Sequence, residues 1–226
     1  MNDKERVKAA WQRLEKWLSE NFPPALENLR DPATDEAIAS VESQIQMLLP
    51  QAVKESFKIH NGEEHNYLPG VLADGFWLMP LEHACETWRQ LKDLAAELFG
   101  NEDNPTQWRS QVEGGIIFIK GAVKPLIGSP KWFPIADMNG DIIRFLDFDP
   151  PDGGTVGQVI EIDAEACQFQ VIAPSFLEHL EQYAADLEAG LYAIEDGYLQ
   201  SRDRLSFDDL QSWGVPEYLK KVDCDS

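Results

Sequence analysis

In the first half of the chain, apolar residues recur at three- and four-residue intervals, which is the period of an α-helix with one buried face. Pro50 suits the first turn of a helix, and Asn61-Gly62 suits the left-handed position that ends one. The patterns predict helices over residues 4–20, from a cap at Thr34 or Asp35 through Ile45, and over residues 51–60 and 81–99. Residues 100–105 are expected to form a polar loop.

After residue 115 the pattern changes to that of strands. Runs of β-branched and aromatic residues predict strands at residues 116–119, 132–135, 142–146, 156–162 and 167–172, and a short one within 74–80. Asn139-Gly140 supplies the positive φ of a tight hairpin turn, and the Pro- and Gly-rich stretch 150–154 supplies a longer turn. A helix over 176–187 follows. Helices, then an antiparallel meander, then a further helix indicate an α+β fold.

The charge of the 226-residue chain is strongly negative, with a formal net value of −21. Residues 135–226 hold 20 Asp and Glu against 5 Lys and Arg, whereas residues 1–134 hold 20 against 14. Such a surface repels nucleic-acid phosphates and attracts basic proteins. We therefore expect a basic protein partner and no nucleic-acid binding. The alternative, that the acidity serves only solubility, stays open.

Five aspartates concentrate within sixteen positions of the predicted hairpins: Asp137, Asp141, Asp147, Asp149 and Asp152. A calcium site is one interpretation, because Asp137-x-Asn139-x-Asp141 matches the first three ligands of an EF-hand loop. However, Ile142 stands where that loop needs glycine, and Phe148 stands where it needs a bidentate glutamate. The pattern favours a hairpin turn whose aspartates accept hydrogen bonds from backbone N–H groups. No metal or other cofactor is expected.

Catalysis is a second interpretation, because Asp147 and Asp149 are expected to project from the same face of a strand. The chemistry would also need a raised pKa and a substrate cleft, which the sequence does not indicate. The histidines are scattered and match no HExxH spacing, and no GxSxG motif is present. We expect solvated carboxylates and a protein that is not an enzyme.

Other features bear on location and on binding. The first residues are charged and helical, no apolar run approaches the length of a membrane span, and three distant cysteines form no CxxC pair. A soluble cytoplasmic protein without membrane contact is expected. Most tryptophans occupy inward positions, but Trp108 is expected to lie in a polar loop. We expect it to be exposed and available to a partner.

Several short motifs occur in the order typical of the SMI1/KNR4 (SUKH) superfamily, which the chain resembles over about residues 35–190. They are Ile38…Leu49-Pro50…Phe57…His60-Asn61-Gly62, Trp77-Leu78 before Pro80-Leu81, Trp132-x-Pro134-Ile135-Ala136, Asn139–Asp141, Leu146-Asp147, Gly157-Gln158-Val159 and Ala173-Pro174-Ser175-Phe176. The resemblance implies a central mixed, largely antiparallel sheet flanked by helices. It also implies an N-terminal helical extension at 1–34, a family domain at 35–190 and a C-terminal extension at 191–226 packed on it.

The resemblance suggests two functions. Bacterial members of the superfamily look mostly like immunity proteins, which neutralise toxins that are often nucleases, and the fungal founders are linked to cell-wall synthesis. Our main hypothesis is a non-enzymatic immunity protein whose acidic surface binds a basic, nuclease-type toxin. In this hypothesis, Trp108 and the five aspartates of the predicted hairpins contact the partner. A regulator of cell-wall synthesis or assembly is the alternative, and a metal-dependent hydrolase is a further, weaker one. The oligomeric state is left open.

Overall fold

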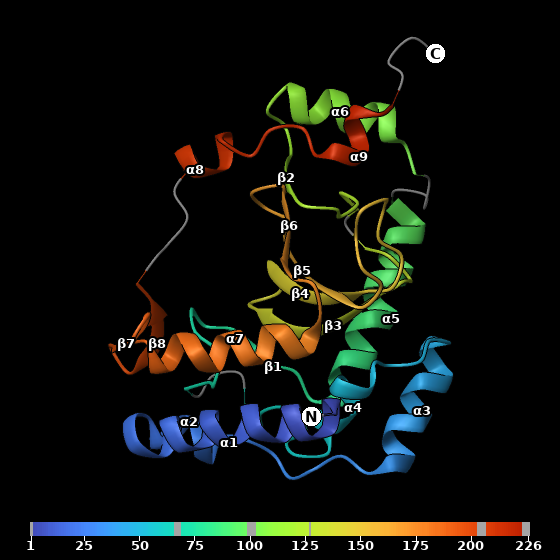
Figure 1. Ribbon diagram of the computed structural model, residues 1–226. Coiled ribbons are helices and arrows are strands. Elements are labelled where there is room, and N and C mark those ends of the chain that lie inside the picture. Colours follow the sequence, from blue (N-terminus) through green and yellow to red (C-terminus); the bar gives the residue numbers. More distant parts are fainter. Residues whose placement is uncertain (1, 66–68, 99–102, 127, 203–206, 223–226) are drawn as a thin grey trace.

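The computed structural model describes residues 2–65, 69–98, 103–126, 128–202 and 207–222 (Figure 1). Its first part is helical, with α1 (Asp3–Asn21), α3 (Asp35–Ile45) and α4 (Gln51–Phe57) where the sequence predicts helices and a short α2 (Pro23–Glu27) that it does not predict. The side chain of Asn2 caps α1, and that of Thr34 caps α3. None of the described helices combines the length and apolar composition needed to cross a membrane.

The centre of the molecule is a six-stranded sheet with the order β1-β3-β4-β5-β6-β2. Neighbouring strands are antiparallel except β2 and β6, which are parallel. This confirms the α+β class and the mixed, largely antiparallel sheet. The strands are β1 (Trp77–Leu78), β2 (Phe118–Lys120), β3 (Trp132–Met138), β4 (Ile142–Asp147), β5 (Gln158–Asp163) and β6 (Gln168–Ala173).

Both predicted turns form where the sequence places them. Asn139 and Gly140 join β3 to β4 with φ values of 57° and 82°. In the longer turn after β4, Gly153 has a φ of 91°, and the N–H of Gly154 donates to the carbonyl of Pro151. Glycine adopts positive φ without the steric cost that a Cβ imposes, so these residues allow the meander to reverse direction.

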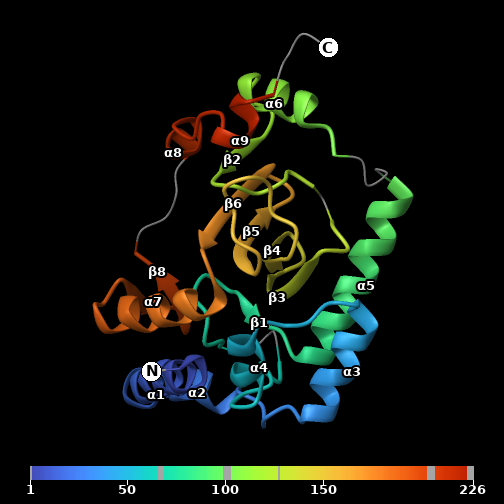
Figure 2. The same ribbon diagram turned by 45° about the vertical axis from the view of Figure 1, so that its right-hand side comes forward.

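The remaining elements cover the sheet. Helix α5 (Leu81–Leu98) packs against β3, whereas α7 (Phe176–Glu188) contacts β5 and β6 from the other side of the sheet (Figure 2). A second, two-stranded sheet is formed by β7 (Tyr192–Glu195) and β8 (Tyr198–Ser201). The C-terminal helices α8 (Phe207–Gln211) and α9 (Glu217–Lys220) lie near α6 (Pro105–Glu113) (Figure 1).

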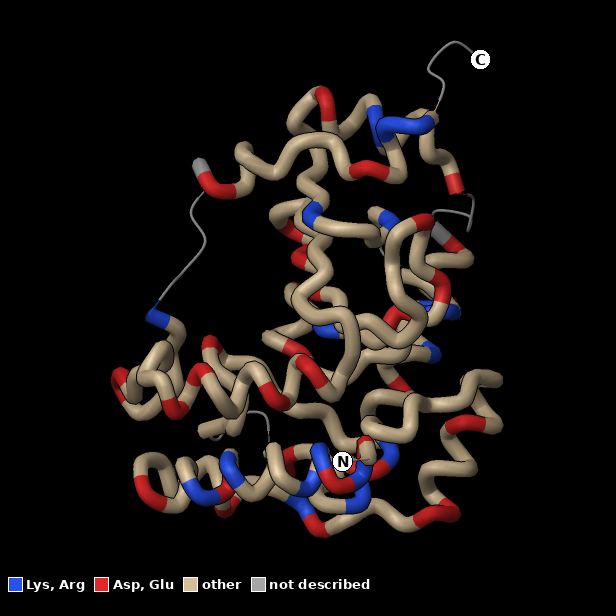
Figure 3. The backbone as a smooth tube through the Cα atoms, viewed as in Figure 1, with Lys and Arg blue, Asp and Glu red and all other residues tan. Residues whose placement is uncertain are grey.

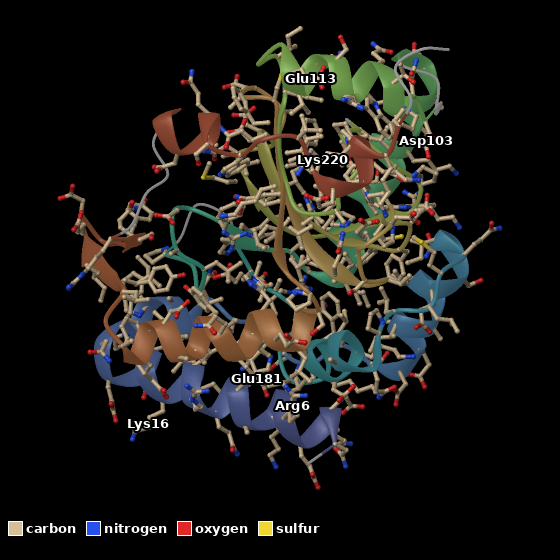
Figure 4. The ribbon with its side chains drawn as sticks, turned by 45° about the horizontal axis from the view of Figure 1, so that its top comes forward. Arg6, Lys16, Asp103, Glu113, Glu181 and Lys220 are labelled. Carbon is tan, nitrogen blue, oxygen red and sulfur yellow. The ribbon has the colours of Figure 1, made fainter. Side chains whose placement is uncertain are left out.

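Helix α1 packs against α7 and α4 and contributes to the same hydrophobic core as the sheet. Figure 4 shows Arg6 of α1 and Glu181 of α7 facing each other, and Arg6 Nε donates to Glu181 Oε1 at 2.8 Å. Buried Trp11 donates from Nε1 to Ser56 Oγ at 2.8 Å. Leu199 and Leu219 from the C-terminal part also join this core. The division at residues 34 and 190 stays a prediction, and both flanking segments share the core.

Substitution of Trp11 by alanine tests the contribution of α1. We expect Trp11→Ala to lower the free energy of unfolding by about 3–5 kcal/mol, because it leaves a large cavity beside α4 and removes a buried hydrogen bond. Urea denaturation measures the change. The neighbouring Gln12→Ala, at an exposed position of the same helix, should change stability by less than about 0.5 kcal/mol. Equal effects of the two substitutions would show that α1 does not belong to the cooperative core.

Candidate interaction surface

The five predicted docking aspartates lie at two opposite ends of the sheet. Asp137 and Asp141 flank the β3–β4 turn, whereas Asp147, Asp149 and Asp152 lie at or beyond the far end of β4. A six-residue strand is roughly 20 Å long, so the two groups are separated by about that distance. The fold therefore does not bring the five carboxylates together on one surface.

Asp147 is fully buried, which corrects the expectation that it is available to a partner. In the strand register it lies between Trp132 of β3 and Gln158 of β5. Trp132 Nε1 donates to Asp147 Oδ1 at 3.1 Å, and Gln158 Nε2 donates to Oδ2 at 3.0 Å. The backbone N–H of Asp149 also donates to Oδ1. Burial raises the pKa of Asp147, and these hydrogen bonds oppose the rise. Asp147 is thus a structural acceptor.

The other four aspartates remain at least partly accessible. Asp149 is exposed and pairs with Lys124 Nζ at 2.7 Å, so it does not share a face with buried Asp147 as the catalytic interpretation assumed. Asp137 Oδ1 accepts from the backbone N–H of Gly140 at 2.8 Å, which confirms the hairpin-turn interpretation. Asp141 and Asp152 are exposed. Their role in partner binding stays a prediction.

Trp108 is buried, with 6% of its surface exposed, and therefore cannot anchor a partner as expected. It lies in α6, a helix that the sequence analysis did not predict. Asn104 caps this helix by accepting a hydrogen bond from the N–H of Gln107, and Pro105 occupies its first turn. The helix directs Trp108 into the hydrophobic core.

The structural role of Asp147 leads to a stability prediction. Asp147→Ala removes the acceptor of the buried Trp132 Nε1–H and one of the two acceptors of Gln158 Nε2, which also donates to the carbonyl of Ala122. We therefore expect the free energy of unfolding to fall by about 2–4 kcal/mol. Asp152→Ala removes an exposed carboxylate from the same segment and should change it by less than about 0.5 kcal/mol. Chemical denaturation of both variants provides the comparison. An Asp147→Ala protein as stable as the wild type would contradict this role.

A different set of polar residues lies together on the sheet. It is on the face against which α7 packs, at the end of that face that α7 does not cover. Arg144, Glu161 and Gln170 are register partners on β4, β5 and β6, and Lys120 of β2 continues the row. Arg144 Nε donates to Glu161 Oε2 at 2.8 Å, and Gln170 Nε2 donates to Glu161 Oε1 at 2.8 Å. We call these four residues the polar row. Lys120 Nζ lies 5.5 Å from the ring centre of Trp213, so the row reaches the C-terminal segment.

A groove of about 510 Å³ lies above this face, and we call it the sheet groove. Four strands, β3 to β6, form its floor, and the loop before β1 together with β8 contributes a wall. Its lining residues are Asp74, Phe76, Met138, Ile142, Arg144, Glu161, Asp163, Gln168, Gln170 and Gln200. The sheet groove combines carboxylates, amides and apolar side chains, which is the chemistry of a surface that binds a polar ligand or a peptide.

Short contacts hold the wall of the sheet groove in place. Asp74 has a φ of 63°, its N–H donates to the carbonyl of Leu199 at 2.9 Å, and its Oδ1 accepts from the N–H of Ser201 at 2.9 Å. These bonds join the loop to β8. The guanidinium of Arg144 lies 3.7 Å from the ring centre of Phe76, which links the same wall to the floor.

Glu63 also holds the loop before β1 in place, through hydrogen bonds to its backbone and to β1. Its carboxylate is fully buried and accepts from the N–H of Val71 and from that of Leu78, each at 2.7 Å. Burial raises the pKa of Glu63 to about 7, against the effect of the hydrogen bonds from Leu78, Val71 and Asn28. Preceding Gly62 has a φ of 71°, and a Cβ there would lie 2.5 Å from the backbone nitrogen of Pro80. A side chain at residue 62 would thus clash with the backbone of residues 78–80, the segment to which Glu63 is hydrogen-bonded at Leu78.

The raised pKa of Glu63 predicts a pH dependence of stability. Between pH 4.5 and about 7 the folded protein retains the Glu63 proton that the unfolded chain releases. The free energy of unfolding should therefore fall as the pH rises through this window, by on the order of 3 kcal/mol. Glu63→Gln cannot titrate, so its pH profile should lack this component in denaturation measured from pH 4.5 to 8. Glu64→Gln, at the exposed neighbouring position, should retain the wild-type slope, and equal slopes for all three proteins would refute the assignment.

A sequence signal for the sheet groove existed but was weak. In each of the three central strands a single polar residue lies between two apolar ones: Ile143-Arg144-Phe145, Ile160-Glu161-Ile162 and Phe169-Gln170-Val171. Alternation of this kind indicates a face that is not fully buried. The register that aligns the three residues, and the contribution of Asp74 from a distant loop, require the structure.

The fold and the groove define an α+β domain with a mixed sheet that is only partly covered on one face. The chain belongs to the SMI1/KNR4 family (SUKH-1), whose model matches residues 32–182. This confirms the resemblance seen in the sequence motifs.

Curated relatives of the chain are fungal proteins. It is 30% identical over 196 residues to the "Cell wall biosynthesis/cell cycle regulator smi1" of Schizosaccharomyces pombe, covering 84% of this chain and 38% of that protein. It is 29% identical over 237 residues to the "Cell wall assembly regulator SMI1" of Saccharomyces cerevisiae, covering 93% and 47%. A "Glucan synthesis regulatory protein" of Neurospora crassa is 24% identical over 213 residues, covering 84% and 40%. The chain thus spans less than half the length of these relatives.

Proposed function

We propose that the protein regulates the synthesis or assembly of the cell wall and does so by binding other proteins rather than by catalysis. The observation that carries this proposal is the family match together with three relatives whose names describe regulators of the cell wall or of glucan synthesis. These relatives favour the cell-wall alternative of the sequence analysis over the immunity protein.

The chemistry of the candidate surface supports a binding role. Carboxylates that resembled a catalytic pair have other partners, because Asp147 accepts three hydrogen bonds and Asp149 pairs with Lys124. In the sheet groove, both oxygens of Glu161 accept from Arg144 and Gln170. Within the described residues, no group of three or more His, Cys, Asp and Glu could hold a metal ion. The sheet groove combines charged, amide and apolar side chains, and such a mixed surface suits the docking of another protein.

A domain exchange in Saccharomyces cerevisiae tests the proposal. The chain replaces the segment that it matches in the cell wall assembly regulator SMI1, and the chimera is expressed in a strain that lacks this regulator. We expect the chimera to restore wall glucan content and resistance to a dye that binds the wall, because the exchanged domains share a fold and a regulatory role. Glucan assay and growth on the dye are the measurements.

The same regulator with the segment deleted is the control. A chimera present at the abundance of the native regulator, yet no better than the deletion, would refute the proposal.

Acidity favours a second candidate, the immunity protein that neutralises a basic toxin. The net charge of −15 over residues 135–226 would attract such a partner and accelerate its association. A toxin gene next to the gene of this protein, and tight binding of its product, would support this candidate.

A further inference from the structure

We propose that the sheet groove binds an extended segment of a partner protein that carries Arg or Lys side chains. This proposal rests on the proposed function, because it assigns to the interaction domain a binding site and a class of partner. The contacts and charges of the sheet groove carry it, and it replaces the dispersed aspartates as the docking site.

The dimensions of the polar row suit an extended chain. The row crosses β4, β5, β6 and β2, which at about 4.8 Å per strand spacing spans roughly 14 Å. An extended segment of four or five residues covers that length at about 3.3 Å per residue. Side chains along such a segment alternate in direction, so every second one faces the floor of the groove.

Charge complementarity selects a basic segment. The charged lining residues are Asp74, Glu161, Asp163 and Arg144, which leave the groove with two net negative charges. Lys120, at the β2 end of the polar row, lies outside this lining, and its ammonium group lies over the ring of Trp213. Arg144 and Glu161 neutralise each other in their ion pair. Asp74 and Asp163 each use Oδ1 to accept a backbone N–H, from Ser201 and Ala166, and neither forms an ion pair with a described residue. These two carboxylates are therefore the groups that attract a cation of the partner.

Neutral lining residues complement the rest of such a segment. Gln170 donates to Glu161 and retains its amide oxygen as an acceptor, and Gln168 lies beside it on the same face of β6. An amide side chain can both donate to and accept from a peptide group, so these residues suit main-chain recognition. Met138 and Ile142 are half-buried at the same end of the groove and provide apolar contact.

The charge of the whole molecule disfavours other occupants. With a net charge of −21, a second copy of the chain is repelled, and so is a nucleic acid. Lys and Arg gather around α1 and α4 at the base of the molecule, and separate ones also lie on and around the sheet (Figure 3). In the sheet groove, the cation of the lining, Arg144, is paired with Glu161 and so opposes a basic partner only weakly.

Titration of the full chain with an amidated Arg-Val-Arg-Val-Arg-Val peptide at about physiological salt tests the proposal. Fluorescence anisotropy measures the affinity, and amide chemical shifts of the ¹⁵N-labelled protein locate the site. We expect the largest shifts at residues 142–144 and 161–170. We also expect the double variant Asp74→Asn and Asp163→Asn to bind the peptide at least about tenfold more weakly. Asparagine tolerates the positive φ of residue 74 and keeps the Oδ1 acceptor at both positions, so the variant should fold.

The matched control is Asp149→Asn with Asp152→Asn, which removes the same charge at the far end of the sheet. It should change the affinity by less than about twofold, because charges beyond a Debye length are largely screened. Equal weakening by both pairs, shifts centred on residues 147–152, or no binding at millimolar peptide would overturn the proposal. A glucan oligosaccharide that shifts the groove amides when the peptide does not would also overturn it.

The binding experiment is independent of the domain exchange in yeast. Peptide binding at another site, together with a chimera that functions, would refute the groove assignment and leave the regulatory role standing. Binding in the sheet groove together with an inactive chimera would refute the cell-wall role alone.

Discussion

The register of β4 between β3 and β5 determines what the sheet presents on each face. It places Asp147 opposite Trp132 and Gln158 on the buried side, and it aligns Arg144 with Glu161 on the open side. A shift of one residue would exchange these faces, burying an arginine and exposing Phe145 and Ile143. Such a shift would leave buried charges unpaired, so the hydrogen bonds of Asp147 select the register as well as stabilise it. The polar row and the core therefore depend on the same pairing.

The loop between α4 and β1 connects this sheet to the helical part. Glu63 accepts hydrogen bonds from the backbone N–H of Val71 in the loop and from that of Leu78 in β1, and Tyr183 of α7 donates to the carbonyl of Val71 at 2.7 Å. The loop then reaches β8 through Asp74. Among the described residues, no buried side-chain nitrogen or oxygen lacks a hydrogen-bond partner. The wall of the sheet groove is thus held by satisfied polar contacts and not by loose packing.

Much of the fold could be read from local patterns. The spacing of Leu14 and Leu18 predicts α1, and Asn139-Gly140 predicts the turn after β3, because both signals depend on neighbouring residues only. Local patterns did not indicate α6, although Asn104-Pro105 is a good helix start, because the polar residues around it are also typical of a loop. The burial of Asp147 and Trp108 depends on residues distant in sequence, so the prediction that both lie at the surface, made from residue type and neighbouring residues, was wrong. The sheet groove forms because the register of β4, β5 and β6 aligns their polar residues and because a loop some seventy residues earlier in the chain supplies Asp74. Neither the register nor this long-range contact can be predicted from a local pattern.

The strands at the two edges of the six-stranded sheet are short. β1 has two residues and β2 has three, so neither edge offers a long row of unpaired backbone groups. Edges of this kind resist the edge-to-edge association that leads to aggregation. They also give an incoming chain little to pair with as an added strand, a mode of binding in which main-chain hydrogen bonds give much of the affinity. For the docking proposed above, these short edges leave recognition to side chains, which can discriminate between partner sequences that share the same backbone conformation.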